Sequence, residues 1–424
     1  MTRTTMWRSL AVAGAAALVL SACSSDDSGS DDAAADVPAG DGTLTVGTIL
    51  PVTGSLAFLG PPEIAGSELA IQEINEAGGY NDKDVVISQG DSGDTSTDIA
   101  NQTVDRLLSE NADAIIGAAS SSVSLTVIDK ITGAGVVQFS PANTSIALST
   151  YDDGGLYWRT APPDTLQGSV LATLALDDGN GSAAILALQD AYGEGLANSF
   201  ETNFTDGGGT VTSKQIYDPK AANFSAEVSQ AASENPDAIV LIGFEESKTI
   251  LQELIKQGIG PDNKKLYLVD GNLSNTIADG LPAGIMEGVK GTLPGAEAPQ
   301  EFRDRLLEVD PALTDFSYAA ETYDAVILTA LAAIAADADS GEAIASQLQA
   351  VSTEGEQCDN FADCKALLEE GKDIDYEGVS GPIEFGDNGD PTEATMGIYE
   401  YGPDNTYPST AVQYISGPVP PVEG

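Results

Sequence analysis

The feature that most constrains the fold is a strand–helix alternation that runs twice along the chain. Short apolar and β-branched runs, such as Thr43–Leu50, alternate with amphipathic segments such as Thr95–Glu110, whose apolar side chains recur on one helical face. The same pattern restarts after Asp164. Because these strands are nearly continuous in apolar residues, helices must cover both faces of parallel sheets. The sequence therefore predicts an α/β protein with two doubly wound parallel-sheet lobes.

The alternation loosens after Gly271. We expect a strand at Val289–Leu293, a long Ala-rich helix at Tyr318–Ala336 and a further strand at Thr395–Tyr401. The final Pro- and Gly-rich stretch is expected to be poorly ordered.

The N-terminus is typical of an exported protein. Arg3 and Arg8 precede an apolar stretch, Leu10–Leu20, that is too short to cross ~30 Å of hydrocarbon. Small residues then precede Cys23, as in a bacterial lipobox, where the thiol is acylated and becomes the first mature residue. An ordinary cleaved signal with an incidental cysteine is the alternative.

We therefore predict a signal peptide over residues 1–22 and a lipidated Cys23 that anchors the protein to the outer face of the cell membrane. Residues 23–42 are rich in Ser, Asp, Ala and Gly and have almost no apolar mass. Such a segment cannot bury enough surface to fold, so we expect a flexible tether.

Charge and residue content exclude several classes of function. A net charge of -49, from 66 acidic and 17 basic residues, repels nucleic acid and anionic headgroups. The sequence has no histidine, which excludes Ser-His and Cys-His nucleophilic pairs and His-ligated zinc. It also has no Gly-x-Ser-x-Gly elbow. We therefore expect neither an enzyme nor a bound cofactor.

The Asp-rich stretches Asp91–Asp94 and Asp387–Asp390 do not have the spacing of a calcium-binding EF-hand loop. Both are predicted to be turns, and no metal site is expected. After Cys23 two cysteines remain, Cys358 and Cys364, close together in an exported chain. A local disulfide is the expectation, because their spacing is not that of a Cys-x-x-Cys redox motif.

Ligands of open parallel α/β sheets bind beyond the carboxyl ends of the strands. The loop Gly117–Ser122 runs into a helix, where free N–H groups and hydroxyls can hold a carboxylate, although one serine is expected to cap the helix. In the next loop, Pro141 fixes a turn that lets Ala142 and Thr144 point donors into the same space. Together these two loops predict an anion-binding wall.

The second lobe offers two more loops after strands, Asp190–Gly193 and Gly243–Ser247. Tyr192 could lie over the apolar body of a ligand, and Glu245 or Glu246 could hold an ammonium group. Alternatively, these acids only occupy the first turn of a helix, where the macrodipole favours negative charge. The residues alone leave both readings open.

An ordered set of motifs resembles the branched-chain amino acid (Leu/Ile/Val) type of ABC-transporter substrate-binding protein, with the type I periplasmic-binding-protein fold. The motifs include Pro51-Val52-Thr53-Gly54, Ile74-Asn75-Glu76-Ala77-Gly78-Gly79, Ser121-Ser122, Ser140-Pro141-Ala142-Asn143-Thr144, Arg159-Thr160, Gln167-Gly168 and Tyr192-Gly193-Glu194-Gly195. The resemblance implies two lobes joined by three crossings, near 161–163, 270–272 and 390–395. Lobe 1 would comprise 43–162 plus 272–391, and lobe 2 would comprise 163–271 plus 392–424.

The resemblance also implies the ligand site. The implied residues are Leu59, Ser121, Ser122, Ala142, Thr144, Tyr192 and Glu246. Ser121 matches the serine that binds the ligand carboxylate, and Glu246 matches the acidic partner of the ligand ammonium. Leu59 stands where many members have an aromatic residue. The segment from Cys358 and Cys364 onward resembles an extended-tail subgroup of this family, and the ligands of that subgroup vary.

The implied function is capture of an amino acid for an ABC permease by a monomer that meets the membrane through its lipid anchor only. A receptor for amides, urea-like molecules or aromatic acids, in uptake or sensing, is the alternative on the same fold.

Overall fold

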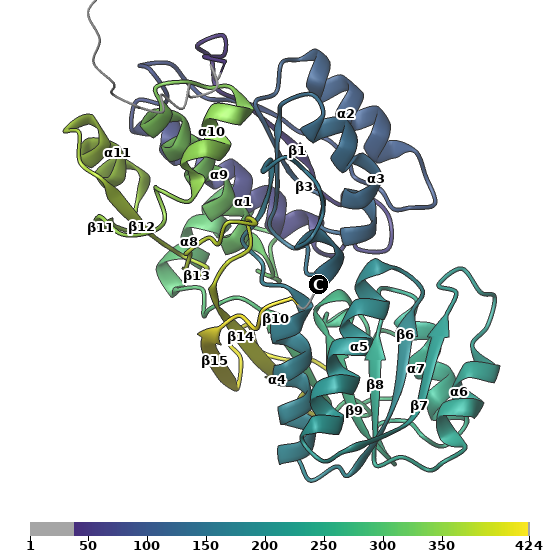
Figure 1. Ribbon diagram of the computed structural model, residues 1–424. Coiled ribbons are helices and arrows are strands. Elements are labelled where there is room, and N and C mark those ends of the chain that lie inside the picture. Colours follow the sequence, from purple (N-terminus) through teal and green to yellow (C-terminus); the bar gives the residue numbers. More distant parts are fainter. Residues whose placement is uncertain (1–37, 423–424) are drawn as a thin grey trace, which may run out of the picture. The chain divides into compact units, whose positions relative to one another are not determined.

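The computed structural model describes residues 38–422. The predicted signal peptide, Cys23 and most of the predicted tether lie outside these residues. The described chain forms two large sheets, each with helices packed on both faces, and one small sheet (Figure 1).

The first large sheet has five parallel strands in the order β2-β1-β3-β4-β5. The strands are β1 (Thr45–Ile49), β2 (Val86–Ser88), β3 (Ala114–Gly117), β4 (Val137–Ser140) and β5 (Tyr157–Arg159). The helices that accompany them are α1 (Gly60–Glu76), α2 (Ile99–Ser109), α3 (Ser121–Thr132), α8 (Gln300–Val309), α9 (Ala319–Ala336), α10 (Gly341–Leu348) and α11 (Phe361–Glu369), with the 3-10 turn η1 (Ile146–Leu148) before β5. Helix α1 packs against α9, and α2 packs against α3.

Helix α9 is the central helix of this lobe. It packs against α1, α10 and α11 and against the strands β3 and β4, and its apolar residues belong to the same core as those of α1. The helix is long and apolar enough to pass for a membrane span by composition, but 83% of it is buried within the protein. Its burial identifies it as a core helix.

The second large sheet has seven strands in the order β15-β14-β10-β9-β8-β6-β7. The strands are β6 (Ser182–Leu188), β7 (Thr210–Tyr217), β8 (Ala238–Ile242), β9 (Lys265–Val269), β10 (Lys290–Pro294), β14 (Glu393–Glu400) and β15 (Gln413–Pro418). The covering helices are α4 (Asp164–Asp177), α5 (Ala191–Asp206), α6 (Ser225–Ala232) and α7 (Ser247–Lys256), and the 3-10 turn η2 (Asp270–Asn272) follows β9. The central strand β8, with the sequence AIVLI, is buried along its whole length, as expected for a parallel strand covered on both faces.

Two expectations about this sheet were wrong. We expected residues 272–391 to belong with the first sheet, but β10 pairs in parallel with β9 and antiparallel with β14, so it has second-sheet partners on both sides. We also expected a poorly ordered C-terminal stretch, but β15 pairs with β14 from Glu393 opposite Pro418 to Ile398 opposite Gln413. Strand pairing overrides the Pro and Gly content here because the partner strand supplies the ladder hydrogen bonds.

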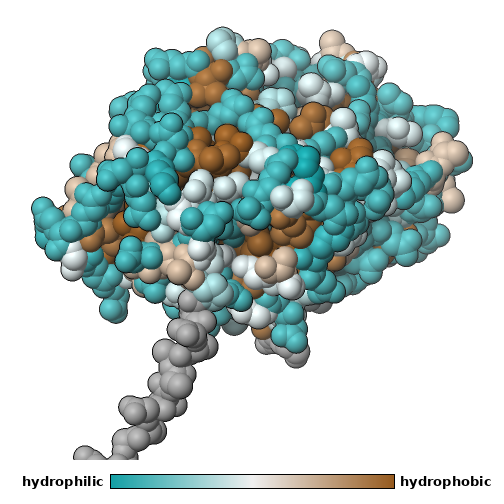
Figure 2. Space-filling model, turned by 90° about the horizontal axis from the view of Figure 1, so that it is seen from above, coloured by the Kyte–Doolittle hydropathy of each residue, from teal (hydrophilic) through white to brown (hydrophobic). Residues whose placement is uncertain are grey.

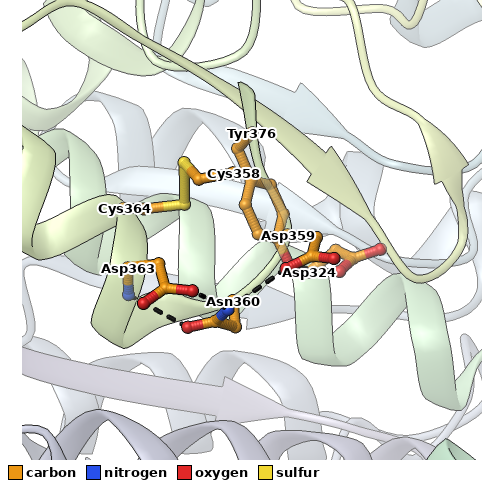
Figure 3. Close-up of a disulfide and its surroundings, with 7 residues drawn as sticks. All are labelled: Asp324, Cys358, Asp359, Asn360, Asp363, Cys364 and Tyr376. Atoms are coloured by element: carbon orange, nitrogen blue, oxygen red, sulfur yellow. Dashed lines mark hydrogen bonds between the residues drawn. A yellow bond between two sulfur atoms is a disulfide. The ribbon is translucent and has the colours of Figure 1, made fainter. Parts of the chain in front are cut away.

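The small sheet lies beside α11 and consists of β11 (Glu356–Cys358), β12 (Ile374–Gly378) and β13 (Gly381–Pro382). Cys358 and Cys364 form a disulfide that ties β11 to α11 (Figure 3). Tyr376 Oη donates to Asp324 Oδ1 of α9 at 2.7 Å, and Ser380 N donates to Asp324 Oδ2 at 2.7 Å. The buried Asp324 therefore attaches the antiparallel pair β12 and β13 to the core helix α9.

The end of the predicted tether is attached to the first lobe. Asp339 N donates to the carbonyl of Ala39 at 3.2 Å, Ser340 Oγ donates to that of Pro38 at 2.5 Å, and Lys83 Nζ donates to that of Gly42 at 2.6 Å. The expectation of a flexible segment up to residue 42 is therefore wrong for residues 38–42.

Candidate ligand-binding site

A narrow pocket, with only about 10 Å³ of free space, lies where loops from both large sheets meet. Its lining residues are Leu56, Leu59, Ala119, Ser120, Ser121, Ala142, Thr144, Tyr192, Phe244, Asp270, Gly271 and Tyr318. Apart from Tyr318, each of these residues lies on a segment that directly follows one of the strands β1, β3, β4, β6, β8 and β9. The carboxyl ends of parallel strands gather such loops at one edge of a sheet, which is where ligands of open α/β sheets bind.

Three consecutive serines at the start of α3 have three different roles. Ser120 caps the helix, because its Oγ accepts from Val123 N at 3.4 Å. Ser121 is 3% exposed, lines the pocket and accepts from Ser145 N at 3.2 Å, which leaves its hydroxyl proton available for a ligand. Ser122 is not part of the pocket and donates to Asp190 Oδ2 at 3.0 Å.

The loop after β4 is held rigidly against the loop after β3. Asn143 Nδ2 donates to the carbonyls of Ala118 at 2.9 Å and Ala119 at 2.8 Å. Ser140 Oγ donates to Ala118 O at 2.8 Å and accepts from Asn143 N at 3.0 Å. These bonds fix the positions of the neighbouring Ala142 and Thr144 in the pocket wall.

The buried side chain of Arg159 also holds the loop after β4 in place. Arg159 forms an ion pair with Asp390, with 2.6 Å between Nε and Oδ1. Its Nη1 donates to the carbonyls of Asn143 at 3.1 Å and Ser145 at 2.9 Å. The ion pair therefore connects the pocket loop to the segment that enters β14.

The opposite wall is aromatic and acidic. Tyr192 and Phe244 stack with ring centroids 5.5 Å apart and planes inclined by 7°. Tyr192 Oη donates to Asp270 Oδ1 at 2.7 Å, and Tyr318 Oη donates to Asp270 Oδ2 at 2.8 Å. Gln167 Nε2 also donates to Asp270 Oδ1, at 2.9 Å. The carboxyl group of Asp270, 5% exposed, is thus oriented by three side-chain donors.

The electrostatics of this wall favour a cation. Burial raises the pKa of Asp270, and the hydrogen bonds from Tyr192, Gln167 and Tyr318 oppose that rise by stabilising the ionised form. Burial and the charge of Asp270 together raise the pKa of the neighbouring Asp164 well above its ordinary value. A positive group in the pocket would relieve the repulsion between these two acids.

Glu246, the acid predicted to hold the ligand ammonium, does not line this pocket. Its Oε1 accepts from Tyr217 Oη and Phe244 N, both at 2.9 Å, and the residue occupies the N-cap position of α7. It lines an adjacent cleft of about 670 Å³ together with Asp190 and Lys248. The structure thus places Asp270 at the pocket and Glu246 at the adjacent cleft, and the role predicted for Glu246 stays a prediction.

The resemblance placed Asp270 at a crossing between the lobes and did not assign it to the site. Its sequence signal was nevertheless present, since Asp270-Gly271 follows the apolar strand β9 as the other pocket loops follow their strands.

The remaining predicted residues lie as follows. Leu59 is buried and lines the pocket with Leu56 on the segment after β1, which makes this end apolar. Beside the pocket, loops of the two sheets touch directly: in addition to the bond from Ser122, Ser145 Oγ donates to the carbonyl of Ala191 at 2.8 Å. Within residues 38–422, no group of three or more His, Cys, Asp or Glu side chains is arranged to hold a metal ion.

Comparison with known proteins identifies similar chains over nearly the whole described length. A "Leu/Ile/Val-binding protein homolog 1" of Brucella suis is 26% identical over 379 residues, which cover 86% of this chain and 92% of that protein. A "chemotactic signal transduction system substrate-binding protein BasB" of Halobacterium salinarum is 26% identical over 362 residues, covering 81% and 83% of the two chains.

Among solved structures, a leucine-binding protein LivK of Thermotoga maritima has a TM-score of 0.71 at 21% identity and covers 88% of this chain and 99% of its own. A solute-binding protein of R. palustris in complex with 4-hydroxybenzoate has a TM-score of 0.71 at 15% identity, covering 89% and 98%. These neighbours share the fold. The model of a family described as periplasmic binding protein matches residues 43–405, and the chain therefore belongs to the periplasmic binding protein family.

Proposed function

We propose that this protein is the extracytoplasmic solute-binding protein of an ABC importer and that it captures a branched-chain amino acid for delivery to the permease. The observation that carries the proposal is the polarity of the pocket. Its first-sheet wall presents Ser121 and Thr144, and its second-sheet wall presents the carboxyl of Asp270. An α-amino acid is a small molecule with a carboxylate and an ammonium group that match these two walls.

Each part of the ligand has a counterpart in the pocket. The hydroxyls of Ser121 and Thr144, with the backbone at Ala142, would bind the carboxylate. Asp270 would accept from the ammonium group. Leu59 and its apolar neighbours would surround an aliphatic side chain. The names of the relatives, several of which are Leu/Ile/Val-binding protein homologues, support the same ligand class.

Binding would favour a closed arrangement of two lobes. A ligand that touches both walls binds better when the loops of both sheets surround it, so it shifts the population toward closure. We propose lobe boundaries adjusted for strand pairing, with residues 43–162 and 295–391 in lobe 1 and residues 163–294 and 392–422 in lobe 2.

An aromatic acid is the second candidate, because two neighbours of the same fold bind 4-hydroxybenzoate and benzoate. The stacked pair Tyr192 and Phe244 could face an aromatic ring. A benzoate would, however, leave the buried Asp270 without a positive partner, which costs free energy. We therefore favour the amino acid.

We also propose that the protein is exported, acylated at Cys23 and active as a monomer. The support for acylation is the sequence around Cys23. A Cys23→Ala variant should appear in the culture medium, whereas the parent protein remains with the membrane fraction, as detected by immunoblot. Retention of the variant in the membrane would refute a lipid anchor at this residue.

Calorimetry with leucine, isoleucine, valine and benzoate tests the assignment. Asp270→Asn should weaken amino-acid binding by about 1–3 kcal/mol, because a buried ammonium loses its charged acceptor. Glu246→Gln is the matched control and should leave the affinity unchanged, since Glu246 lies outside the pocket. Unchanged affinity in Asp270→Asn, or tighter binding of benzoate than of any amino acid, would refute the proposal.

A further inference from the structure

A second cavity, of about 260 Å³, lies between the strands β10 and β14 and the segment that leads from α8 into α9. Of the residues that line the candidate ligand pocket, only Tyr318 also lines this cavity. The side chains that define its chemistry are Asp315, Phe316, Tyr318, Glu321, Tyr399 and Tyr407. The second cavity therefore combines four aromatic rings with two acids.

The carboxyl of Glu321 is buried without an ion-pair partner among residues 38–422. Glu321 lies in the first turn of α9, is 4% exposed and lines the second cavity. Within residues 38–422, no basic side chain forms an ion pair with its carboxyl, and the hydrogen bond from its own backbone N–H offsets only part of the effect of burial on its pKa. A buried carboxyl in this state gains free energy from a positive partner.

The absence of a side chain at Gly295 makes room for the carboxyl of Glu321. Gly295 follows β10 with φ of +116°, and a Cβ atom at this position would lie 2.3 Å from Glu321 Oε1. Only glycine leaves that space open and tolerates that backbone conformation. The carboxyl is thus accommodated at the cavity wall.

The nearby charges do not neutralise the two acids. Within the described residues, Arg303 is the one basic side chain that lines the second cavity, and its Nη2 donates to Gln300 Oε1 at 3.0 Å. Asp315 Oδ1 accepts from Ser317 N at 2.8 Å, which orients the carboxylate without balancing its charge. The net charge of -49 also attracts cations to the protein and repels anions.

We propose that the second cavity is a binding site for a small alkylammonium ion, with Glu321 as the counter-ion. Aromatic faces attract ammonium and quaternary ammonium groups through the ring quadrupole, and an adjacent carboxylate adds a direct charge interaction. An anion would meet two acids, and a neutral molecule would leave Glu321 unpaired. The combination of rings and acid therefore selects a cation.

Proton linkage supports the same site. Burial raises the pKa of Glu321 to about 8, and the charge of Asp324 contributes to the rise. A bound cation stabilises the ionised carboxyl, so binding at neutral pH should release a proton. The titratable and charged groups around Glu321 are Glu63 on α1, Asp324 on α9, Tyr399 on β14, Arg303 on α8, and Asp315 and Tyr318 on the segment before α9.

Calorimetric titration of the purified protein with choline tests the proposal. Choline carries a permanent charge, and its neutral carbon analogue 3,3-dimethylbutan-1-ol separates charge from shape. Titrations at about pH 8.5 keep Glu321 largely ionised. About 0.3 M sodium chloride screens exposed charges and suppresses non-specific binding to the acidic surface. We expect one choline per protein and at least about tenfold weaker binding of the alcohol.

Variants then locate the site. Glu321→Gln keeps the shape of the side chain and should weaken choline binding at least about tenfold. Glu301→Gln, an exposed acid on α8 that does not line the second cavity, removes the same charge and should bind choline like the parent. Ser409→Arg places a positive charge on an exposed loop at the cavity wall, which repels choline, and should also weaken its binding.

Three results would overturn the proposal: no choline binding by the parent protein, equal binding of the alcohol, or full choline affinity in both Glu321→Gln and Ser409→Arg. Because Ser409 is exposed, its variant keeps the test decisive even if Glu321→Gln alters folding. The failure of amino-acid binding at Asp270 would leave this test intact, since neither variant lies in the ligand pocket.

Discussion

The pair of buried acids Glu63 and Glu321 should make the protein less stable as the pH rises. The Glu63 side chain, on α1, is fully buried, and neither of its carboxyl oxygens has a hydrogen-bond partner within residues 38–422. Burial and the charge of Glu321 raise the pKa of Glu63 well above its ordinary value. Burial raises the pKa of Glu321 from 4.5 to about 8. Folding therefore favours the protonated form of both groups.

The sign and size follow from proton linkage. A carboxyl whose pKa is higher in the folded than in the unfolded protein binds more protons when folded, so the free energy of unfolding falls as the pH rises between the two values. For Glu321 this interval runs from 4.5 to about 8. Because one pKa unit corresponds to about 1.4 kcal/mol, the full loss from this group is about 5 kcal/mol.

The variant Glu321→Gln removes the titration while keeping the shape. Relative to the parent, it should gain several kcal/mol of stability at about pH 8.5 and little or none near pH 4.5. Denaturant unfolding followed by tryptophan fluorescence measures this, since Trp158 is the one tryptophan outside the predicted signal peptide. Trp158 is buried in the same hydrophobic core as Ala320, next to Glu321, and packs against Phe385 with ring centroids 5.2 Å apart.

The exposed Glu301→Gln is the control, because it removes one acid without changing a buried group. Equal stability differences from the parent at both pH values in Glu321→Gln would refute the reasoning, because they would show that Glu321 does not titrate between them in the folded protein. The experiment needs no ligand and is independent of both binding proposals.

Two further predictions concern the framework of the molecule. Arg159→Met should lower the free energy of unfolding by about 3–5 kcal/mol, because it leaves the buried Asp390 without its partner. Denaturant unfolding measures this loss, and a value below about 1 kcal/mol would contradict the role of the ion pair. Replacing Cys358 and Cys364 by serine should lower the free energy of unfolding by about 2 kcal/mol, as expected for a disulfide that closes a short loop. The ligand affinity measured by calorimetry should stay unchanged, because the disulfide does not line the pocket. Altered ligand affinity would contradict that separation.

Local patterns in the sequence were sufficient to predict the architecture. The apolar runs and helical periodicities predicted the parallel strands and covering helices. A strand that is buried on both faces of its sheet needs apolar residues at consecutive positions, so the sequence records its burial directly. The surface seen in Figure 2 is mainly hydrophilic with separate hydrophobic patches, in keeping with the acidic composition. The pocket loops after β3 and β4 could also be found, because their position after strands is itself a local feature.

Long-range strand pairing could not be predicted in the same way. β10 was predicted as a strand but not as a member of the second sheet, and β15 lies in a Pro- and Gly-rich segment without a strand signal. Their places depend on partners far away in the chain, such as Gln413 opposite Ile398 and Lys290 opposite Tyr267. Pairing of this kind is decided by the sheet as a whole.

The choice between Asp270 and Glu246 shows the same division. The sequence alone determined that acids follow two neighbouring strands of the second lobe, β8 and β9, and that serines and a threonine follow two strands of the first. Only the tertiary structure decided which acid lines the pocket, because Glu246 is held by Tyr217, whereas Asp270 is oriented by Tyr192 and Tyr318. The physical reason is that side-chain direction depends on hydrogen bonds between residues distant in sequence, which no local pattern records.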